Sequence, residues 1–384
     1  MHYKPIGGGY SESITMLRFP LAVLVVFIHS FGPALDVEQL HADGLSGMAV
    51  YDYLRIFISV VIARSAVPLF FLFSGFLFFK GVEQFDKTVY AEKLRKRWHS
   101  LARPYLIWNI LMVLWVMAFK IGGILLHGKP WSGIGDYFAE NGYLHMLWDS
   151  SIWNERTTWL GNAVYHSGPI LFPFWYMRDL MILVALTPVL YWLIKRLRIG
   201  FVLIVVAIYV ADIRVSWFSG TMASALCFFS IGAYFSIMRQ DFTQVLWRWR
   251  YLIIPLTVAL ILIQTTTGSD MGDYTSKMIH LWLVLIQTFA FIIVASALCR
   301  YRKLYELNRK LAPSSFFIYA SHVFILGHVS GIVKRLTPMS DAWYMQSIDY
   351  LITPLVCIAL CIAVYTVGRL WMPGAMKLLM GERR

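Results

Sequence analysis

The sequence predicts an all-α integral membrane protein with about ten transmembrane helices and both termini in the cytoplasm. Apolar residues make up 59% of its 384 residues and charged residues only 14%, with a mean hydropathy of +0.62, whereas soluble domains carry about 25% charged residues. The apolar residues gather in runs of about 17–25, the length that crosses a bilayer. Such runs must be helical, because lipid offers no partner to a free backbone N–H or C=O.

Ten runs of this kind follow one another along the chain. They lie near residues 13–32, 56–79, 102–121, 172–194, 199–216, 219–238, 251–267, 279–299, 312–333 and 350–372. An even number of spans puts both termini on one side. With the N-terminus in the cytoplasm, most Lys and Arg fall on inner loops, notably 80–103 and 300–310, as the positive-inside rule requires. We therefore expect one transmembrane domain over residues 1–384, with the lipid bilayer as its surroundings.

The net charge of +13 is explained by these inner loops, so we expect no nucleic-acid partner. The four cysteines lie inside apolar runs and lack the spacing of a disulfide framework or a metal site. We interpret them as small core residues and expect no metal. They are Cys227, Cys299, Cys357 and Cys361. The sequence shows no internal repeat, which argues against a transporter built from inverted halves.

An outer loop of fifty residues, 122–171, interrupts the pattern and is rich in aromatic residues, glycine and histidine. Long ordered loops are more often functional than not, and this one could lie on the membrane surface as interfacial helices that cover a cavity. The alternative is a belt of interfacial tryptophans. The side chains concerned are Trp131, Trp148, Trp153, Trp159, His145 and His166.

Two ionisable residues share the first span, LRFPLAVLVVFIH at 17–29. Arg18 and His29 are eleven residues apart, so on a helix they lie within about 20° of one face and about 16 Å apart. Ionisable groups are expensive to bury in a membrane and mark functional positions. Arg18 is a permanently charged anion ligand, and His29 is a base whose ordinary pKa lies near neutral pH. The alternative is a snorkelling arginine with a hydrogen-bonded structural histidine.

The block FWYMRDL at 174–180 holds the adjacent residues Arg178 and Asp179. On a helix they point about 100° apart and need not pair with each other. An aspartate at the depth of His29 could orient that histidine and stabilise its imidazolium. Arg178 and Asp179 are therefore catalytic candidates, with a structural ion pair between helices as the alternative.

The block SFFIYASH at 315–322 places His322 in the middle of the ninth span. We include His322 among the candidate donor-binding residues, with a satisfied core histidine as the alternative. In VPLFFLFSGF at 67–76, Ser74 and Gly75 interrupt an aromatic run. Small residues at that point favour close helix packing over a catalytic serine.

In this order along the chain, the blocks resemble the membrane-bound acyltransferase 3 family, the family of polysaccharide O-acetyltransferases and related enzymes. Arg18 and His29 match its Arg-x10-His motif in the first span. The aromatic SGF block, the stretch RPYLIWN at 103–109 and the blocks FWYMRDL and SFFIYASH resemble later parts of the family. Many members carry a Glu-containing block where this chain has Arg178-Asp179, so the role of that pair is inferred from charge and depth alone.

The resemblance implies an enzyme that takes an acyl group, usually acetyl, from cytosolic acyl-CoA and passes it to an acceptor at or beyond the bacterial inner membrane. Arg18 would hold the donor and His29 would act as the base. Acetyl-CoA would be a co-substrate, and we expect no permanently bound cofactor. The phosphates of CoA suit the basic loop after the second span. Its candidate donor-binding residues are Arg95, Arg97 and Arg103, with Lys93 and Lys96 beside them.

We expect the acceptor to be a hydroxyl of a glycan or lipid-linked sugar, which His29 deprotonates as it attacks the thioester carbonyl. An acyl-histidine intermediate is the alternative. A transporter or flippase of a lipid-linked glycan, with the same buried charges along its path, is the rival function. A non-catalytic scaffold would leave those charges unexplained. Replacing His29 by Ala separates the first two functions, because only acyl transfer needs a base. The oligomeric state is left open.

Overall fold

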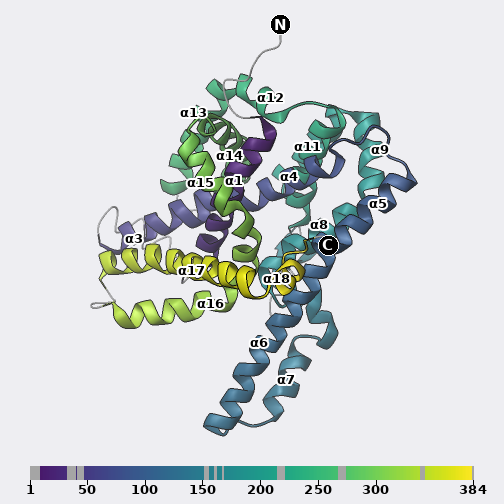
Figure 1. Cartoon of the computed structure of the whole chain (residues 1–384). Helices are drawn as coiled ribbons and strands as arrows, with labels where there is room; N and C mark the ends of the chain where they lie inside the picture. The colour runs from purple at the N-terminus through teal and green to yellow at the C-terminus, as the bar shows by residue number, and fades with distance from the viewer. Residues whose placement is uncertain are drawn as a thin grey trace. The chain divides into compact units, whose positions relative to one another are not determined.

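The protein is almost entirely helical (Figure 1). The structure, a computed structural model, describes residues 9–32, 40, 47–150, 155–159, 162–166, 168–213, 221–266, 274–337 and 342–382. One antiparallel hairpin, β1 (Glu155–Trp159) with β2 (Asn162–His166), is the exception within these residues, pairing Glu155 with His166. The all-α prediction therefore holds apart from this hairpin.

Six helices in the described residues are long and apolar enough to cross a membrane, by length and composition. They are Tyr10–His29, Met48–Phe79, Lys87–His127, Tyr274–Leu298, Arg302–Leu336 and Trp343–Trp371. Two bent pairs raise the number to eight if each pair is one span: Phe172–Ala185 with Thr187–Leu197, at 65°, and Met222–Ile237 with Phe242–Arg248, at 103°. The chain is thus a multi-pass membrane protein.

Two of the ten expected spans are short helices, α10 (Ile199–Val210) and α13 (Arg250–Thr266). Their 12 and 17 residues extend about 18 and 26 Å at 1.5 Å per residue, less than the roughly 30 Å of a hydrocarbon core. Every expected span coincides with a helix or a bent pair, but the number ten and the cytoplasmic termini stay predictions.

Several long helices contain irregular turns. Met48–Phe79 is built from α3 (Met48–Arg55), the π-helix η1 (Ile56–Ile62), the 3-10 turn η2 (Ala63–Ser65) and α4 (Ala66–Phe79). Lys87–His127 joins α5 (Lys87–Arg97), η3 (Trp98–Ala102) and α6 (Arg103–His127). Arg302–Leu336 joins α15 (Arg302–Leu311), η7 (Ala312–Ser314) and α16 (Ser315–Leu336). Such breaks inside helices frequently occur at functional sites.

The chain forms two compact units, and each has its own core. The first comprises Met1–Lys80 and Ile231–Thr366, and the second Gly81–Ser230 and Val367–Arg384. The prediction of a single domain over 1–384 stays a prediction.

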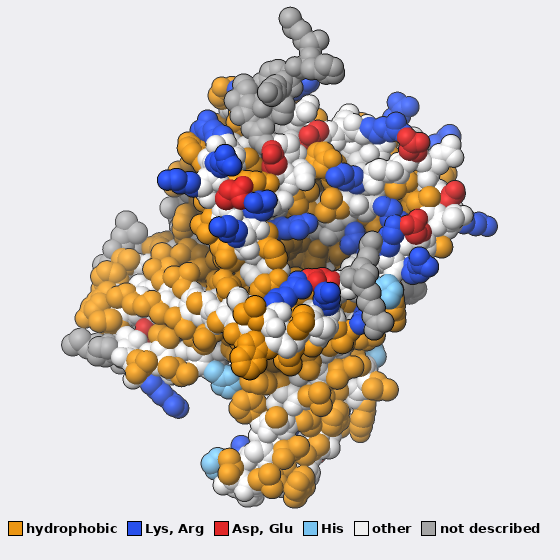
Figure 2. Space-filling view, viewed as in Figure 1, with side chains coloured by type: hydrophobic (Ala, Val, Ile, Leu, Met, Phe, Trp, Pro, Cys, Tyr) orange, Lys and Arg blue, Asp and Glu red, His pale blue; other side chains and the backbone are white. Residues whose placement is uncertain are grey.

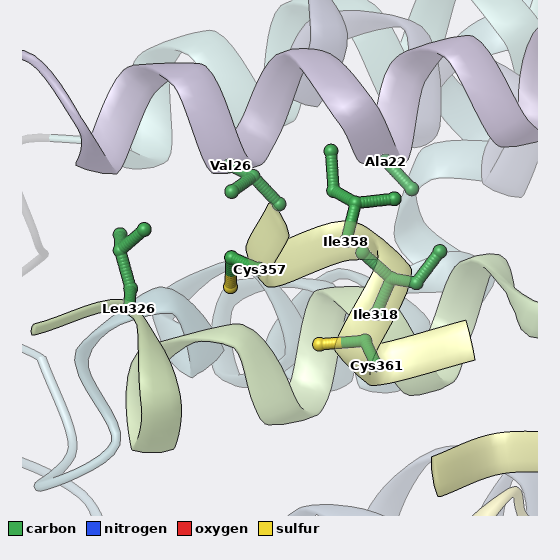
Figure 3. Packing of buried hydrophobic residues seen from close by; sticks show 7 residues of the cluster. All are labelled: Ala22, Val26, Ile318, Leu326, Cys357, Ile358 and Cys361. Atoms are coloured by element: carbon green, nitrogen blue, oxygen red, sulfur yellow. The ribbon is translucent and has the colours of Figure 1, made fainter. Parts of the chain in front are cut away.

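In the first unit, α1 (Tyr10–His29) is the central helix, in contact with α4, α14 (Tyr274–Leu298), α15 and α16. Figure 3 shows Ala22 and Val26 of α1 facing residues of α16 and α17 (Trp343–Trp371). Two of the four cysteines, Cys357 and Cys361, belong to this cluster and are buried. Cys227 is buried too, whereas Cys299 is half-buried. The interpretation of small core residues therefore fits three of the four.

The charged side chains of the first unit follow the expected polarity. In Figure 2, Lys and Arg gather over α15, whereas the surface over α16 and α17 is mostly hydrophobic. A broad apolar surface on helices of spanning length is what a lipid environment requires. The basic end of this unit is therefore the one expected to face the cytoplasm.

The second unit contains the loop 122–171, and the described part of this loop includes helical segments, as the interfacial-helix alternative predicts. Residues 122–127 still belong to α6, and the short helix α7 (Ser132–Glu140) then packs against α6. Tyr137 and Met146 are buried against apolar side chains of α6. Of the predicted surface aromatics, Trp131 and Trp148 are exposed. The side chains of Trp153, Trp159 and His166 lie outside what the structure describes.

Candidate functional site

Arg18 and His29 stand on one uninterrupted helix, as the spacing predicts. The helix begins with a capping interaction in which the backbone N–H of Gly9 donates to Glu12, and it continues through Pro20 to its last residue, His29. The Arg18 side chain is exposed. It has no hydrogen-bond or ion-pair partner among the described residues. Arg18 is thus available to an anion from outside the protein.

His29 lines a cavity of about 500 Å³ in the first unit. The other lining residues come from the segment after α1, from α3, and from the facing parts of α16 and α17. They are Ser30, Gly32, Tyr51, Leu326, Gly327, Ser330, Lys334, Gln346, Asp349, Tyr350 and Thr353. This volume lies in the range typical of small-molecule sites. The candidate base therefore has access to a polar cavity.

The cavity wall beside His29 is held by buried hydrogen bonds. The Tyr350 hydroxyl lies 2.7 Å from Ser59 Oγ, and Ser59 Oγ donates to the Phe27 carbonyl at 2.5 Å. The Tyr350 ring also packs edge-to-face on Phe27, with 5.8 Å between centroids. These contacts tie η1 and α17 to the last turn of α1, which is the turn that carries His29.

His322 lies next to His29, with 5.2 Å between the ring centroids. It is fully buried, and its Nδ1 is 3.1 Å from the carbonyl of Ile318. Because a carbonyl oxygen only accepts, Nδ1 carries the proton and Nε2 is left as an acceptor. Nε2 has no partner among the described residues. The structure thus brings together two residues that lie almost three hundred positions apart in the sequence.

Arg64 is a component of this site that the sequence analysis missed. It lies in η2, in the middle of a candidate span, and its charge acts on both His29 and His280 of α14. The side chain is exposed. It makes no hydrogen bond or ion pair with any described residue. An arginine inside an apolar run was the signal that would have found it.

Arg55 is a second buried charge that the sequence analysis missed. Its Nε donates to Asp52 at 2.6 Å, and its Nη1 donates to the Phe31 carbonyl at 3.3 Å. The guanidinium also lies over the rings of Phe31 and Tyr51, at 4.5 and 5.3 Å from their centroids. Arg55 therefore fixes the chain directly after His29 against α3.

Arg178 and Asp179 belong to the second unit and pair with each other, contrary to the expectation that they need not. Arg178 Nε and Nη2 donate to Asp179 Oδ1 at 3.1 and 3.0 Å. Thr221 donates to Asp179 Oδ2 at 2.5 Å, and Arg178 Nη1 donates to the Trp148 carbonyl at 3.1 Å. The two side chains are 3% and 0% exposed. Both carboxylate oxygens are thus engaged within the second unit. A catalytic role toward His29 stays a prediction.

The predicted donor-binding residues, four arginines and His322, are divided between the two units. Arg18 and His322 lie in the first, whereas Arg95, Arg97 and Arg103 lie in the second. Arg95 and Arg97 stand in the last turn of α5, and Arg103 is the first residue of α6. Arg95 is exposed, and the other two are half-buried. Each arginine can therefore reach a polyanion.

Within the first unit, the geometry combines a base with a cluster of positive and neutral nitrogen groups. His322 lies beside His29, and the charge of Arg64 acts on both His29 and His280. A guanidinium can stabilise the negative charge that develops on a carbonyl oxygen under attack. A histidine at the same place accepts the proton of the attacking group. The arrangement is suited to acyl transfer.

Comparison with known proteins gives the same class of chemistry. The chain is 25% identical over 381 residues to the succinoglycan biosynthesis protein ExoH of Rhizobium meliloti (strain 1021), an alignment that covers 97% of this chain and 92% of that protein. No solved structure matches. The profile of the family described as acyltransferase domain matches residues 11–368. This stretch includes Arg18, His29 and His322. The chain therefore belongs to the acyltransferase 3 family and is a membrane acyltransferase.

Proposed function

We propose that this protein moves an acyl group, acetyl in the simplest case, from cytosolic acyl-CoA to a hydroxyl of a glycan or lipid-linked sugar. In this proposal the chain crosses a bacterial inner membrane ten times, with both termini in the cytoplasm. The observation that carries the proposal is α1 itself. One end of its polar stripe is Arg18, which has no partner among the described residues, and the other end is His29 at a cavity.

The donor half of the proposal follows from charge and length. CoA is a polyanion whose phosphates suit arginines, and its reactive thioester is separated from them by an extended pantetheine arm. Arg18 and His29 are about 16 Å apart along the helix. Arg18 would hold the phosphates while the thioester lies beside His29. Arg95, Arg97 and Arg103 are the candidates for donor contacts in the second unit. The bare Nε2 of His322 would accept a hydrogen bond from an amide N–H of the arm.

The chemical step is a direct transfer in this proposal. His29 takes the proton of the acceptor hydroxyl, and the oxygen attacks the thioester carbonyl to form a tetrahedral intermediate. Arg64 stabilises the negative oxygen of that intermediate. The C–S bond then breaks, the ester remains on the acceptor, and the proton on His29 passes to the departing CoA thiolate. No co-reactant beyond donor and acceptor is needed.

The acceptor half draws support from the relative rather than from the fold. Its name places ExoH in the biosynthesis of succinoglycan, a polysaccharide. A glycan hydroxyl is therefore the acceptor we propose for this chain. Arg178 and Asp179 remain catalytic candidates in this proposal. Because they already make hydrogen bonds within the second unit, a measurement of activity is needed to test that role.

Isothermal titration calorimetry of the purified full chain with acetyl-CoA tests the donor half. Saturable binding should weaken about tenfold or more in Arg18→Ala, because a charge-assisted contact to phosphate is lost. It should survive in His29→Ala, which should nevertheless have lost acyl transfer. Arg335→Ala is the matched control, since Arg335 is an exposed arginine at the far end of α16 and should bind the donor as wild type does.

Well-folded protein that binds no acyl-CoA would contradict the proposal. So would a His29→Ala variant that still transfers the acyl group. The flippase function would be favoured instead if His29→Ala exported a lipid-linked glycan at the wild-type rate and neither the wild type nor the variant transferred an acyl group.

A further inference from the structure

The cavity at His29 has a lining of both polar and apolar groups, which suits the hydroxyls and the apolar face of a sugar. Its walls present hydroxyls, an amide, a carboxylate and two tyrosines, with Leu326 as the single aliphatic side chain among the described lining residues. Sites for small polar ligands place a few oriented polar groups within such a wall. We infer that this cavity binds one neutral sugar residue of the acceptor, an inference that rests on the proposed acyltransferase function.

Asp349 is the group best placed to recognise sugar hydroxyls. It lies in the first turns of α17, and Thr337 Oγ1 donates to its Oδ1 at 2.5 Å. Oδ2 has no hydrogen-bond partner among the described residues, and Asp349 lines the cavity. A carboxylate that accepts hydrogen bonds from hydroxyl donors forms stronger bonds than a neutral acceptor does. Asp349 would therefore fix the sugar, with Gln346 one turn earlier on the same helix.

The two tyrosines form a rigid wall for the apolar face of the sugar. Tyr51 and Tyr350 pack edge-to-face, with centroids 6.3 Å apart and planes at 82°. Tyr350 is anchored by Ser59 and Phe27, and Tyr51 lies under the Arg55 guanidinium. Both rings are nearly buried. Rigid amphipathic rings supply contact area with little loss of conformational entropy on binding.

The charge of the cavity favours a neutral sugar over an acidic one. The described lining holds one carboxylate, Asp349, and one ammonium, Lys334 on α16, whose formal charges balance, so a sugar without a charge leaves that balance undisturbed. The candidate base His29 lies in the same cavity, so a hydroxyl of the bound sugar comes within reach of it. The site would thus select both the acceptor and the hydroxyl that is acylated.

A cysteine-labelling experiment tests sugar binding in the cavity without a measurement of acyl transfer. In sealed right-side-out membrane vesicles, Gln346→Cys should react with a membrane-impermeant maleimide, and a neutral glycoside such as methyl β-glucoside should slow the reaction several-fold. The matched control is Ser347→Cys, at a neighbouring residue that does not belong to the described cavity lining; it should react at one rate with and without the glycoside. Equal rates for Gln346→Cys with and without the glycoside would overturn the inference, even if acyl transfer is established.

Kinetics then assign the role of Asp349. In Asp349→Asn, the KM for the glycoside acceptor should rise about tenfold, because a charge-assisted hydrogen bond becomes a neutral one. Calorimetric binding of acetyl-CoA should stay at the wild-type value. An unchanged KM, or an equal loss of donor binding, would overturn the assignment. The glycoside could also protect Gln346→Cys in a protein that binds no acyl-CoA. That result would support the sugar site and reject the acyltransferase mechanism.

Discussion

The arginine in η2 is the residue whose position most needs a ligand. Arg64 has open space in front of it and no hydrogen bond to any described residue. A guanidinium inside a membrane-spanning helix is costly unless it meets a counter-charge or polar groups. The histidines near it, His29 and His280, supply no negative charge. In the proposed mechanism, the carbonyl oxygen of the thioester is the group that Arg64 would contact.

We predict that Arg64→Gln lowers the rate constant of acyl transfer by about 100-fold or more, the effect of removing one donor to a developing oxyanion. Arg64→Lys should recover part of the rate because it restores the charge without the fork of donors. Steady-state kinetics with labelled acetyl-CoA measure both. A Gln variant with wild-type kcat and only a weaker KM for the donor would place Arg64 in substrate binding instead.

Arg178 and Asp179 illustrate the opposite case, a buried pair with every strong partner in place. We predict that Asp179→Ala destabilises the protein by about 3–5 kcal/mol, because it leaves a buried guanidinium without its carboxylate. Thermal unfolding followed by size-exclusion chromatography should show a clear fall in melting temperature. The control Asp136→Ala changes an exposed aspartate of α7 and should melt as wild type does.

A catalytic role for this pair would show differently. Asp179→Asn also loses the carboxylate but keeps the shape and one acceptor oxygen, so it should be destabilised less than Asp179→Ala. Loss of transfer by folded Asp179→Asn, with acetyl-CoA binding retained, would support the catalytic prediction. Melting of Asp179→Ala at the same temperature as Asp136→Ala would contradict the structural role.

At the scale of elements, the packing of α11 (Met222–Ile237) on α4 depends on a single glycine. A Cβ at Gly232 would lie 1.9 Å from the Leu72 carbonyl oxygen and 2.9 Å from the Phe76 backbone nitrogen. Backbone atoms cannot rotate away as a flexible side chain can. Small residues at such points let helices approach closely. Close helix packing was predicted at Ser74-Gly75 of α4, whereas the glycine on α11 that packs against this helix was not predicted.

We predict that Gly232→Ala destabilises the fold by about 1–3 kcal/mol, because the two helices must move apart. The matched control is Gly331→Ala in α16, where a Cβ meets nothing within 4 Å, so stability should be unchanged or slightly higher. Melting temperatures in detergent compare the two variants directly. Equal melting of both would show that α4 and α11 are not in close contact.

The irregular turns of the long helices explain how the site is assembled. A π-helix followed by a 3-10 turn, η1 and η2, changes the direction in which successive side chains point. In the same way, Thr187-Pro188 breaks the pair α8 (Trp175–Ala185) and α9 (Thr187–Leu197), since proline cannot donate to the preceding turn. The resulting bend is 65°. These features follow from local hydrogen bonding rather than from hydropathy.

For the whole molecule, the open question is the orientation in the membrane. We predict that a green fluorescent protein fused after residue 384 is fluorescent and that alkaline phosphatase fused there is inactive, because we expect the C-terminus to lie in the cytoplasm. Alkaline phosphatase fused after Gly133, in α7, should be active on the outer side. An active phosphatase at the C-terminus with an inactive one after Gly133 would invert the topology.

Much of the fold could be predicted from hydropathy alone, since each of the ten expected spans falls on a helix or a bent pair. The lengths of the individual helices were less predictable from the sequence. The sequence contains no sign that α6 runs on to His127 or that 155–159 and 162–166 form paired strands. The bends arise where proline and irregular turns interrupt helices, and a sliding measure of apolarity does not detect such interruptions.

The sequence by itself determined that this chain is a multi-pass membrane protein of an acyltransferase family, and it identified Arg18 and His29. The first follows from composition, and the second from a fixed helical period of 3.6 residues. Only the tertiary structure decided that His322 and the cavity lie beside His29, that the charge of Arg64 acts on His29, and that Asp179 is bonded within the other unit. The reason is physical: which faces of distant helices meet depends on packing of side chains and on bends, and these are set by contacts between segments far apart in the chain.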